Sequence, residues 1–465
     1  MRLLLVSFNQ EIAPYPVMPL GVMYLAHYLR LRGIRVDIHD RYLADDQALA
    51  QRLSATDYAA VGISIRNIDN ILYPKTVSYL KDLQDLVGHV KQHTRAPVIL
   101  GGSGYSIFPG SLLAATGADY GICGEGEVVL YRLLRDLGDP DALAGLPGLY
   151  RRHPGGVLGP TNTQSLINTE FTNSFPLRDT AITAPYLKTG GMVNIQLKRG
   201  CPFGCIYCTY PLIDGRTVRL RDSHQVVAEI AYLKQQFNFD YFYFVDSVFN
   251  YPLEEARRFV RALRASNLHI KWTAFFNPRF VDHAFMQDVY ASGCREVEFG
   301  AEAGADQVLA ALGKGFCVND ITRAHRICRD IGIKTAYYFM IGSPGETRET
   351  IDQSIAFFDQ LNPDAVFLMP GIRIYPKTAL HAIAVEQEVV SSGNDLLQPV
   401  FYAQEPPMAY ALERLQQKAA QDARWVFPSL GLNFYPELLI KLRKFGAKGP
   451  LWSRLKRTKP HKSQS

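Results

Sequence analysis

Three cysteines, Cys201, Cys205 and Cys208, lie within eight residues of one another. Their C-x3-C-x2-C spacing can turn three thiolates onto one metal centre if the backbone curls tightly, which Gly200 and Gly204 permit. A structural zinc ion or a closed iron–sulfur cluster takes four protein ligands, so a loop with three leaves one iron of a [4Fe–4S] cluster open. The spacing therefore predicts an open cluster, and three buried or zinc-binding cysteines are the alternative.

An aromatic residue, Tyr207, directly precedes the last of these cysteines. With it, the loop resembles the signature of the radical S-adenosylmethionine superfamily. The resemblance implies that the open iron binds the amino and carboxylate groups of S-adenosylmethionine, with Tyr207 nearby. It also implies that the reduced cluster cleaves this cofactor to a 5′-deoxyadenosyl radical, with electrons from a donor such as a flavodoxin or ferredoxin.

The chain has 465 residues, 47% of them hydrophobic and 20% charged, which is enough for two or three ordinary folded domains. It contains no run of about 18 uncharged apolar residues, which argues against a membrane span, and its apolar start is too short for a signal peptide. The other four cysteines show no pairing pattern; they are Cys123, Cys294, Cys317 and Cys328. These features predict a cytoplasmic protein, where an oxygen-labile cluster would persist.

Residues 1–140 alternate short apolar strands with helical segments. This alternation predicts a doubly wound, Rossmann-like parallel sheet with helices on both faces. Such sheets bind ligands beyond the carboxyl ends of their strands, where residues 64–70, 101–105 and 124–127 combine glycine or small residues with polar ones. A large cofactor can approach the backbone of such loops closely, and a plain glycine turn is the alternative for each.

This half of the chain resembles the cobalamin-binding domain that precedes the radical domain in one large subgroup of the superfamily. The resemblance rests on Pro19-Leu-Gly21 before Leu25-Ala26 and on the three loops after the strands. It assigns cobalamin contacts to Leu20, Gly21, Ser64, Arg66, Asn67, Gly101, Gly102, Ser103, Gly124 and Glu125. Flavin or nucleotide binding is the rival, although no Gly-x-Gly-x-x-Gly follows the first strand.

The Asp-x-His-x-x-Gly loop that supplies a lower axial histidine in other cobalamin domains is absent, because the first strand runs into Ser7-Phe-Asn-Gln10. The nucleotide base of cobalamin must then be displaced with no histidine in its place. We hypothesise that Arg66, or its neighbours Asn67 and Asp69, occupies the lower face of cobalt. A cation there would disfavour a sixth ligand and keep cobalt reactive as a nucleophile.

Residues 141–189 carry several prolines and glycines with little periodicity, and they predict a linker along the sheet edge. Residues 190–380 again repeat strand then helix, which predicts a partial (β/α)6 barrel with its site at the carboxyl ends of the strands, where the cysteine loop lies.

Polar and glycine residues follow successive strands of this predicted barrel. Resemblance to the family assigns S-adenosylmethionine contacts to Asp246, Asn277, Glu302, Gly342 and Glu346, and makes Tyr338 and Arg373 candidate catalytic residues. Each has a structural alternative, because strand-end carboxylates often cap helices and Arg373 can pair with a carboxylate at the edge of the core.

Residues 381–465 contain helical stretches and no strand pattern, and they predict a mostly helical region. The family resemblance implies that this region closes over the substrate. Residues 441–462 hold nine Lys or Arg and no Asp or Glu, and much of the net charge of +6 comes from this tail. A solvated tail and a weak contact with an anionic membrane are both open interpretations. No nucleic acid partner is expected, since no such binding module is recognisable.

The resemblance implies three cofactors: a [4Fe–4S] cluster, S-adenosylmethionine and cobalamin. It further implies a methyltransferase, in which one S-adenosylmethionine methylates cobalt and another yields the radical that activates a carbon of a small natural-product or lipid intermediate. A cobalamin-dependent cyclase or rearrangement enzyme without methyl transfer is the alternative. A cobalamin or redox sensor is a third hypothesis, which the full set of polar strand ends disfavours.

Overall fold

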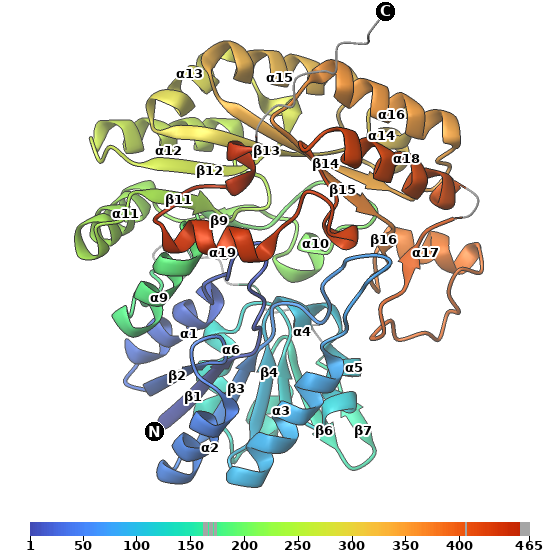
Figure 1. The fold of residues 1–465 in the computed structure, drawn as a ribbon. Helices are drawn as coiled ribbons and strands as arrows, with labels where there is room; N and C mark the ends of the chain where they lie inside the picture. The colour runs from blue at the N-terminus through green and yellow to red at the C-terminus, as the bar shows by residue number, and fades with distance from the viewer. Residues whose placement is uncertain (161–165, 167–170, 172–173, 405–406, 456–465) are drawn as a thin grey trace, which may run out of the picture.

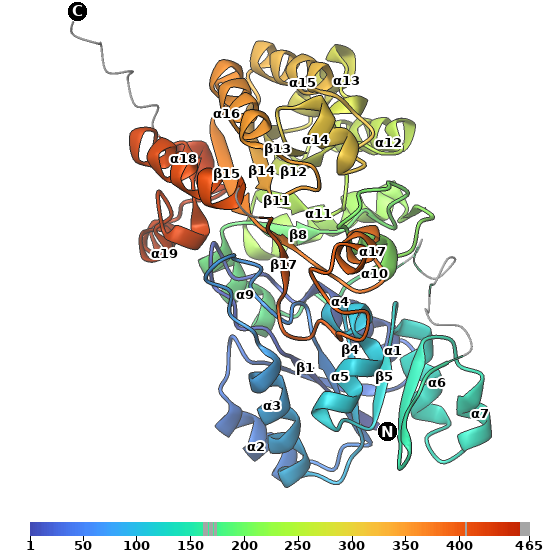
Figure 2. The same cartoon turned by 90° about the vertical axis from the view of Figure 1, so that its right-hand side faces the viewer.

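The computed structural model describes residues 1–160, 166, 171, 174–404 and 407–455. Figures 1 and 2 show two α/β domains stacked on each other, with the N-terminal sheet below and the sheet of the second domain above. No helix among these residues combines the length and apolar character needed to cross a bilayer.

The N-terminal domain is a twisted sheet in the order β2-β1-β3-β4-β5-β6-β7, parallel from β2 to β5. Its strands are β1 (Arg2–Ser7), β2 (Arg35–Asp40), β3 (Ala60–Ser64), β4 (Val98–Gly101), β5 (Tyr120–Ile122), β6 (Leu149–His153) and β7 (Gly156–Leu158). Its helices are α1 (Leu20–Arg30), α2 (Asp46–Ala55), α3 (Leu80–His93), α4 (Ser103–Ile107), α5 (Pro109–Thr116), α6 (Glu127–Arg135) and α7 (Pro140–Ala144).

Strand β1 is buried on both faces, as a central parallel strand must be. Leu3 and Leu5 pack in one apolar cluster with residues of α1 and α6, whereas Leu4 and Val6 pack in another with residues of α2 and α3. This arrangement confirms the doubly wound sheet expected from the sequence. The strand order reverses at β1, so loops from β1 and β3 flank a crevice at the carboxyl edge.

Residues 149–158 form a hairpin that continues this sheet in antiparallel pairing beyond the predicted boundary at residue 140. The expected linker, 141–189, therefore includes two strands and, near its end, α9 (Thr180–Gly190). The glycine and proline content that suggested a linker reflects the tight turn between β6 and β7, where Gly156 has a φ of 128°.

The second domain is a partial barrel of parallel strands in the order β8-β11-β12-β13-β14-β15-β18. Its strands are β8 (Val193–Ile195), β11 (Tyr241–Phe244), β12 (Lys271–Phe276), β13 (Cys294–Glu302), β14 (Lys334–Ile341), β15 (Ala365–Pro370) and β18 (Trp425–Val426). Its helices are α10 (Tyr210–Ile213), α11 (Ser223–Phe237), α12 (Leu253–Ala265), η1 (Pro278–Phe280), α13 (His283–Ala291), α14 (Asp306–Ala311), α15 (Val318–Ile331) and α16 (Arg348–Leu361). A short ribbon of β9 (Lys198–Arg199) and β10 (Arg219–Leu220) flanks the cysteine loop.

The first six strands lie where the sequence predicts them, and the barrel fold is confirmed. The seventh, β18, comes from the region expected to lack strands, and it pairs with β15 through Val366 and Phe367. Apart from β18, the chain after β15 forms β16 (Ile372–Arg373), α17 (Ala379–Glu386), β17 (Phe401–Tyr402), α18 (Pro407–Gln421), η2 (Pro428–Leu430), α19 (Pro436–Lys444) and η3 (Leu451–Arg454).

The last described segment lies at the amino ends of the barrel strands, opposite the cysteine loop. Gly449 N donates to Gly191 O just before β8, and Lys448 pairs with Asp240 just before β11 at 2.6 Å. Trp452 Nε1 donates to Glu298 Oε1 on β13 at 3.1 Å. Residues 436–455 therefore close the bottom of the barrel, and this part of the chain does not have the capping position expected for it.

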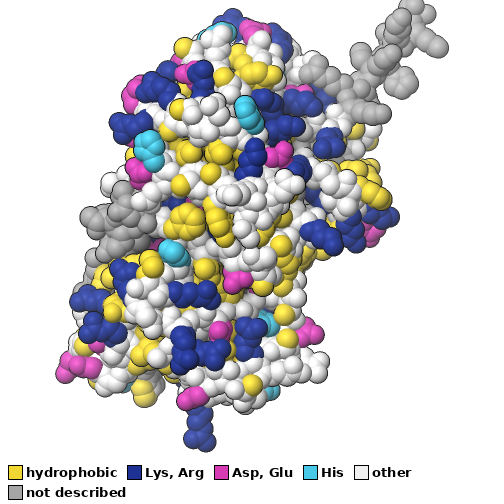
Figure 3. Space-filling view, turned by 90° about the vertical axis from the view of Figure 1, so that its left-hand side faces the viewer, with side chains coloured by type: hydrophobic (Ala, Val, Ile, Leu, Met, Phe, Trp, Pro, Cys, Tyr) yellow, Lys and Arg dark blue, Asp and Glu magenta, His cyan; other side chains and the backbone are white. Residues whose placement is uncertain are grey.

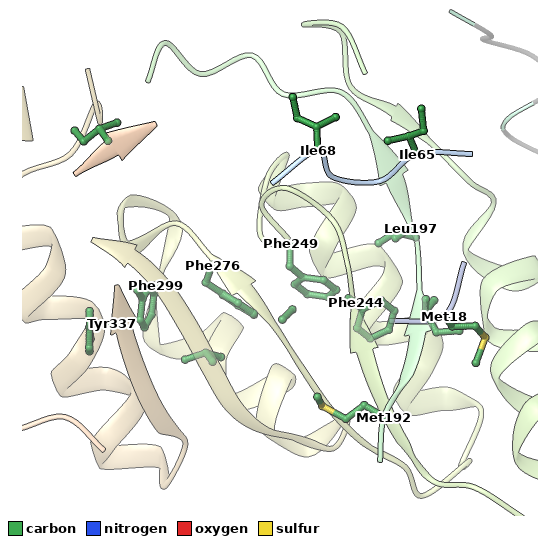
Figure 4. Close-up of a cluster of buried hydrophobic side chains, with 14 of the residues drawn as sticks. Met18, Ile65, Ile68, Met192, Leu197, Phe244, Phe249, Phe276, Phe299 and Tyr337 are labelled. Atoms are coloured by element: carbon green, nitrogen blue, oxygen red, sulfur yellow. The ribbon is translucent and has the colours of Figure 1, made fainter. Parts of the chain in front are cut away.

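Apolar side chains join the two domains into one core. Met18, Ile65 and Ile68 of the N-terminal domain belong to the same buried cluster as Leu197 and Phe244 of the barrel (Figure 4). Burying one such side chain contributes roughly 1.5–3 kcal/mol. The domains are thus held face to face, and Figure 3 shows hydrophobic side chains gathered between them and Lys and Arg spread over both.

Candidate functional site

The cysteine loop follows β8 and β9 at the carboxyl end of the barrel. Gly200 has a φ of 93°, and a Cβ there would overlap the carbonyl oxygen of Thr217, so only glycine fits. Gly204 does not have the role predicted for it, because its φ is not positive and a Cβ would meet nothing within 4 Å. Gly313 takes that role: its φ is 68°, and a Cβ would lie 2.6 Å from Gly204 O.

The three cysteines of this loop are free thiols. Cys201 is buried and Cys205 and Cys208 are half-buried, and none of the seven cysteines forms a disulfide. Within the described ranges no three His, Cys, Asp or Glu side chains converge as one zinc ion requires. Thiolates on a [4Fe–4S] cluster bind different irons, so they stay apart. Burial raises the pKa of Cys208 to about 12, and metal binding would have to displace that proton.

Tyr207 and Glu302 meet beside this loop, together with Lys314, which the sequence analysis missed. The Tyr207 hydroxyl donates to Glu302 Oε1 at 2.9 Å, and Lys314 Nζ lies 3.0 Å from the same oxygen and 3.1 Å from the hydroxyl. Burial opposes the charge on Lys314, but Glu302 and Tyr207 outweigh it and raise its pKa well above the usual value. The sequence signal was present, since Lys314 stands between Gly313 and Gly315 after a strand-end helix.

Glu302 owes its position to an irregular strand end. The register of β13 shifts between Phe299 and Glu302, and Glu302 has a φ of 66°, which is unusual for a residue other than glycine. Such a conformation costs of the order of 1–3 kcal/mol and is concentrated at functional sites. The bulge aims the carboxylate at Tyr207, next to the last cysteine of the loop.

Asp246 is buried after β11 and is only half satisfied. Its Oδ1 accepts from the backbone N–H groups of Leu197 and Lys198, both at 2.9 Å, while Oδ2 has no partner among the described atoms. Burial raises the pKa of Asp246 to about 6. Lys198 donates to the carbonyl oxygens of Phe249, at 2.7 Å, and Tyr251, and burial lowers its pKa to about 8.

Glu346 is similar. Its Oε2 accepts from Gly342 N at 2.6 Å and Ser343 N at 3.2 Å, whereas Oε1 has no partner in the described part of the chain. Burial raises the pKa of Glu346 to about 7. Gly342 has a φ of 107°, and a Cβ there would lie 2.9 Å from Tyr402 O, so this glycine is required by the packing of β17 as well.

Two other predicted residues, Asn277 and Tyr338, have structural partners. Asn277 Oδ1 accepts from Arg279 N and caps η1, as the helix-cap alternative proposed. The Tyr338 hydroxyl donates to Glu298 Oε2 at 2.9 Å, and its ring stacks on Phe367 with centroids 5.0 Å apart.

Arg373 follows the carboxyl end of β15 and lies in the domain junction. Its Nε donates to Asp69 Oδ2 at 3.0 Å, and its terminal nitrogens donate to the carbonyl oxygens of Leu396 and Ile374. Both partners of the ion pair are buried. Asp69 is therefore engaged in an ion pair, and it is not among the residues that line the cavity between the sheets.

A cavity of about 680 Å³ separates the carboxyl edges of the two sheets. All ten residues predicted to contact cobalamin lie on its wall: Leu20, Gly21, Ser64, Arg66, Asn67, Gly101, Gly102, Ser103, Gly124 and Glu125. The barrel contributes to this wall as well, and three of its lining residues, Thr209, Tyr210 and Asp214, lie within six residues after Cys208 in the chain. Sequence reasoning missed these three, although their place beside the cysteine loop was a signal.

The N-terminal wall fits a large, flat cofactor. Gly21 opens space, since a Cβ there meets nothing within 4 Å, and Gly102 lets its loop approach β3, where a Cβ would lie 2.5 Å from Ile65 O. The cavity reaches inward to Leu5 and Gly62 within the sheet. A larger hollow, of about 980 Å³ near Lys91 and His153, lies at the opposite edge of this sheet and does not touch the cysteine loop.

Two charged residues of this wall differ in their partners. Arg66 donates its backbone N–H to Asn9 Oδ1 at 2.7 Å, while its buried Nε has no partner in the described structure, and burial lowers its pKa. Glu125 instead accepts from Arg219 at 2.7 Å and pairs with Arg199 at 3.2 Å across the domain junction. Arg66 is thus available to a ligand, whereas Glu125 ties the two domains together.

Comparisons with known proteins agree with this architecture. Residues 12–134 match the B12 binding domain model, and residues 195–358 match the radical SAM superfamily model. An uncharacterized methyltransferase of Pyrococcus horikoshii is 26% identical over 380 residues, 81% of this chain and 80% of that protein. An anaerobic magnesium-protoporphyrin IX monomethyl ester cyclase of Rubrivivax gelatinosus is 26% identical over 74% of this chain and 62% of its own length.

Among solved structures, the radical S-adenosylmethionine methyltransferase TsrM of Kitasatospora setae, with tryptophan and an S-adenosylmethionine analogue bound, superposes with a TM-score of 0.83. The two are 22% identical, and the superposition covers 97% of each chain. This likeness extends the shared fold over both domains and the C-terminal region. The two family matches, the cysteine loop and the shared cavity together place the chain among the radical S-adenosylmethionine enzymes that carry an N-terminal cobalamin-binding domain.

Proposed function

We propose that this enzyme transfers a methyl group to a carbon atom of a small molecule held between its two domains. The observation that carries the proposal is the single cavity between the sheets, because its wall runs from the glycine loops of the N-terminal domain to the residues that follow Cys208. A cobalamin on one wall and a cluster behind the other would face the same acceptor.

When bound, the cluster with S-adenosylmethionine supplies a carbon-centred radical, and cobalamin supplies a methyl carrier. The residues of the protein would hold these cofactors in place. Cys201, Cys205 and Cys208 would hold the cluster, and the unpartnered oxygens of Asp246 and Glu346 would accept hydrogen bonds from S-adenosylmethionine.

Glu302 and Lys314 present opposite charges beside the cysteine loop, which suits a ligand that carries both an ammonium and a carboxylate. Tyr207 would fix the geometry of this pair, since its hydroxyl contacts both groups. Holding the reacting atoms in one enclosed space also excludes water from them.

Arg66 would lie beneath the corrin, where its cationic side chain disfavours a ligand on the lower face of cobalt. Support comes from its place on the cavity wall and its unpartnered Nε. Asn67 lies beside it on the same wall, exposed. Spectroscopy of bound cobalamin that reports a histidine nitrogen as lower ligand would contradict this assignment.

A small-molecule acceptor suits a cavity of this size, and a reduced flavodoxin or ferredoxin suits the electron requirement of the cluster. The reducing cytoplasm suits an enzyme whose seven cysteines are all unpaired. The acceptor that we propose is a small natural-product or lipid intermediate.

The test uses the full chain, reconstituted anaerobically with iron, sulfide and hydroxocobalamin. Incubation with methyl-deuterated S-adenosylmethionine and a reductant should place the deuterated methyl group on the bound cobalamin, read by mass spectrometry. No label on cobalamin, with both cofactors present in stoichiometric amounts, would overturn methyl transfer.

A cyclase or rearrangement enzyme is the second candidate, and the similarity to a magnesium-protoporphyrin cyclase favours it. It predicts 5′-deoxyadenosine release with no label in cobalamin or product. A sensor predicts neither, because its cluster would change oxidation state without cleaving S-adenosylmethionine.

A further inference from the structure

Helix α19 exposes large apolar side chains on one side. Leu438 is 51% exposed and Phe445, directly after the helix, is 89% exposed, with Tyr435 at 59% before its first residue. Steps of three and seven residues keep these side chains on one face of a helix. The opposite side is fixed, because buried Arg443 donates to the carbonyl oxygens of Ala447 and Gly449 at 2.9 and 2.7 Å. The helix cannot turn to bury its apolar face without losing these bonds.

Cations surround this apolar face. Lys441 and Lys444 are exposed on α19 itself. A hollow of about 470 Å³ begins at Gly446, and its wall carries more basic than acidic groups. The basic residues of the hollow are Lys271, Arg295, Lys334, Lys448 and Arg454, and the acidic ones are Asp240 and Glu296.

The two acidic groups are already engaged. Asp240 pairs with Lys448 at 2.6 Å, and Glu296 accepts from the Tyr241 hydroxyl. Lys334 donates to Ser453 O, and Arg454 donates to Lys448 O at 3.4 Å. The hollow therefore keeps a surplus of positive charge beside the exposed Phe445.

Exposed apolar side chains flanked by lysines and arginines are the combination that binds anionic bilayers. The apolar groups enter the boundary between headgroups and acyl chains, and the cations attract lipid phosphates. We propose that the amino end of the barrel, formed by α19 and this hollow, docks on an anionic lipid surface. The proposal does not depend on the methyl-transfer reaction.

An acidic electron-donor protein fits this surface less well than a membrane does, because the surface lies far from the cysteine loop that would hold the cluster. The hollow is lined by Tyr241 and Lys271, which begin β11 and β12, and by Lys334, which begins β14. The cysteine loop lies at the other end of the same barrel. A strand of eight residues such as β14 spans about 26 Å at roughly 3.3 Å per residue, so a donor docked here would be a barrel length away.

The test is vesicle co-sedimentation of the full-chain holoenzyme. Vesicles of phosphatidylcholine with phosphatidylglycerol should bind the protein, vesicles of phosphatidylcholine alone should not, and high salt should release it. The double variant L438S/F445S should lower the fraction bound at least about tenfold. The variant K441E/K444E should lower it similarly on anionic vesicles.

The matched controls are Leu31→Ser and Lys81→Glu, exposed residues of the N-terminal domain that should leave binding unchanged. Unchanged cobalamin content and melting temperature show that each variant is folded. Absence of binding to anionic vesicles overturns the proposal. Unaltered binding by L438S/F445S, with binding lost on deleting residues 456–465, overturns it too, as does a dimer that L438S/F445S dissociates.

Discussion

The two walls of the interdomain cavity are built differently. On the cobalamin side, the start of α1 and the strand ends present backbone and small residues such as Gly21, Gly101 and Gly102, and they leave room for a ligand. On the barrel side, the wall carries charged side chains that already bond to protein atoms, as Arg199 does to Glu125 and Glu127.

This difference indicates how each wall would recognise its ligand. A corrin ring offers mostly shape, so its wall needs space and close backbone approach. S-adenosylmethionine carries charges, so its wall needs charged groups, and such groups are stable inside a protein only when they also bond to protein atoms. Removing a charged side chain from the barrel wall should therefore weaken S-adenosylmethionine binding. Adding a side chain to the cobalamin wall should weaken cobalamin binding.

The largest effect is expected from Cys205→Ala. Two thiolates cannot hold a [4Fe–4S] cluster in place of three, so the iron content and all 5′-deoxyadenosine formation should be lost. Cobalamin binding should persist, since Cys205 is not part of the cobalamin wall. Iron analysis and the cobalamin absorption spectrum check the two halves separately. Loss of cobalamin together with iron would mean that the two walls form as one unit.

The second prediction adds a side chain to the cobalamin wall. Gly21→Leu places a bulky group where a Cβ meets no protein atom, so the fold should persist while cobalamin affinity falls at least tenfold, about 1.4 kcal/mol. Gly88→Leu is the control, because Gly88 is also helical, exposed and free of Cβ contacts, on α3. Titration with hydroxocobalamin measures both. Equal affinities for the two variants would place the corrin elsewhere.

The third prediction concerns Arg373, which we predicted to be catalytic and which lies at the junction. Arg373→Met leaves Asp69 charged, buried and unpaired, which should cost about 3–5 kcal/mol. The double variant D69L/R373M should recover most of that loss, because neither charge remains. Thermal melting of the parent, both single variants and the double variant measures the coupling. A stable Arg373→Met variant that has lost only turnover would restore the catalytic role.

The sequence predicted the strands and the residues at their ends well. It predicted poorly which other residues these side chains bond to. The strands were recoverable because parallel strands buried on both faces read as apolar runs, as in Arg2–Ser7 and Lys334–Ile341. Strand ends, together with the family resemblance, then located ten residues that line the cavity, since the carboxyl ends of parallel strands share one edge.

What a strand-end side chain bonds to was not recoverable. The pairing of Arg373 with Asp69 joins residues 304 positions apart, and only the packing of the two domains brings them together. Lys314 was missed because it follows a helix, not a strand, and β18 because two residues leave no periodic pattern. Local patterns do not contain such long-range contacts.

The last effect is expected at Glu346, where its size depends on pH. Burial raises its pKa from 4.5 to about 7, so between these values the native protein keeps a proton that the unfolded chain loses. The contribution of this group to the free energy of unfolding is therefore complete below pH 4.5. It falls as the pH rises to about 7, by about 3 kcal/mol at most. Glu346→Gln stays neutral and keeps an acceptor for the N–H groups of Gly342 and Ser343, so it should gain stability relative to the parent over this range.

Denaturant unfolding at a series of pH values measures this difference. Glu349→Gln, an exposed change three residues further along in the first turn of α16, should lack the gain, because the pKa of Glu349 is lowered, not raised. Adding S-adenosylmethionine separates a binding role from a structural one: a cationic group beside Glu346 would lower its pKa and release a proton on binding near pH 6. Calorimetry in buffers of different ionisation enthalpy counts that proton. A parent protein that releases none, with Glu346→Gln binding equally well, would leave Glu346 as a cap for residues 342–343 alone.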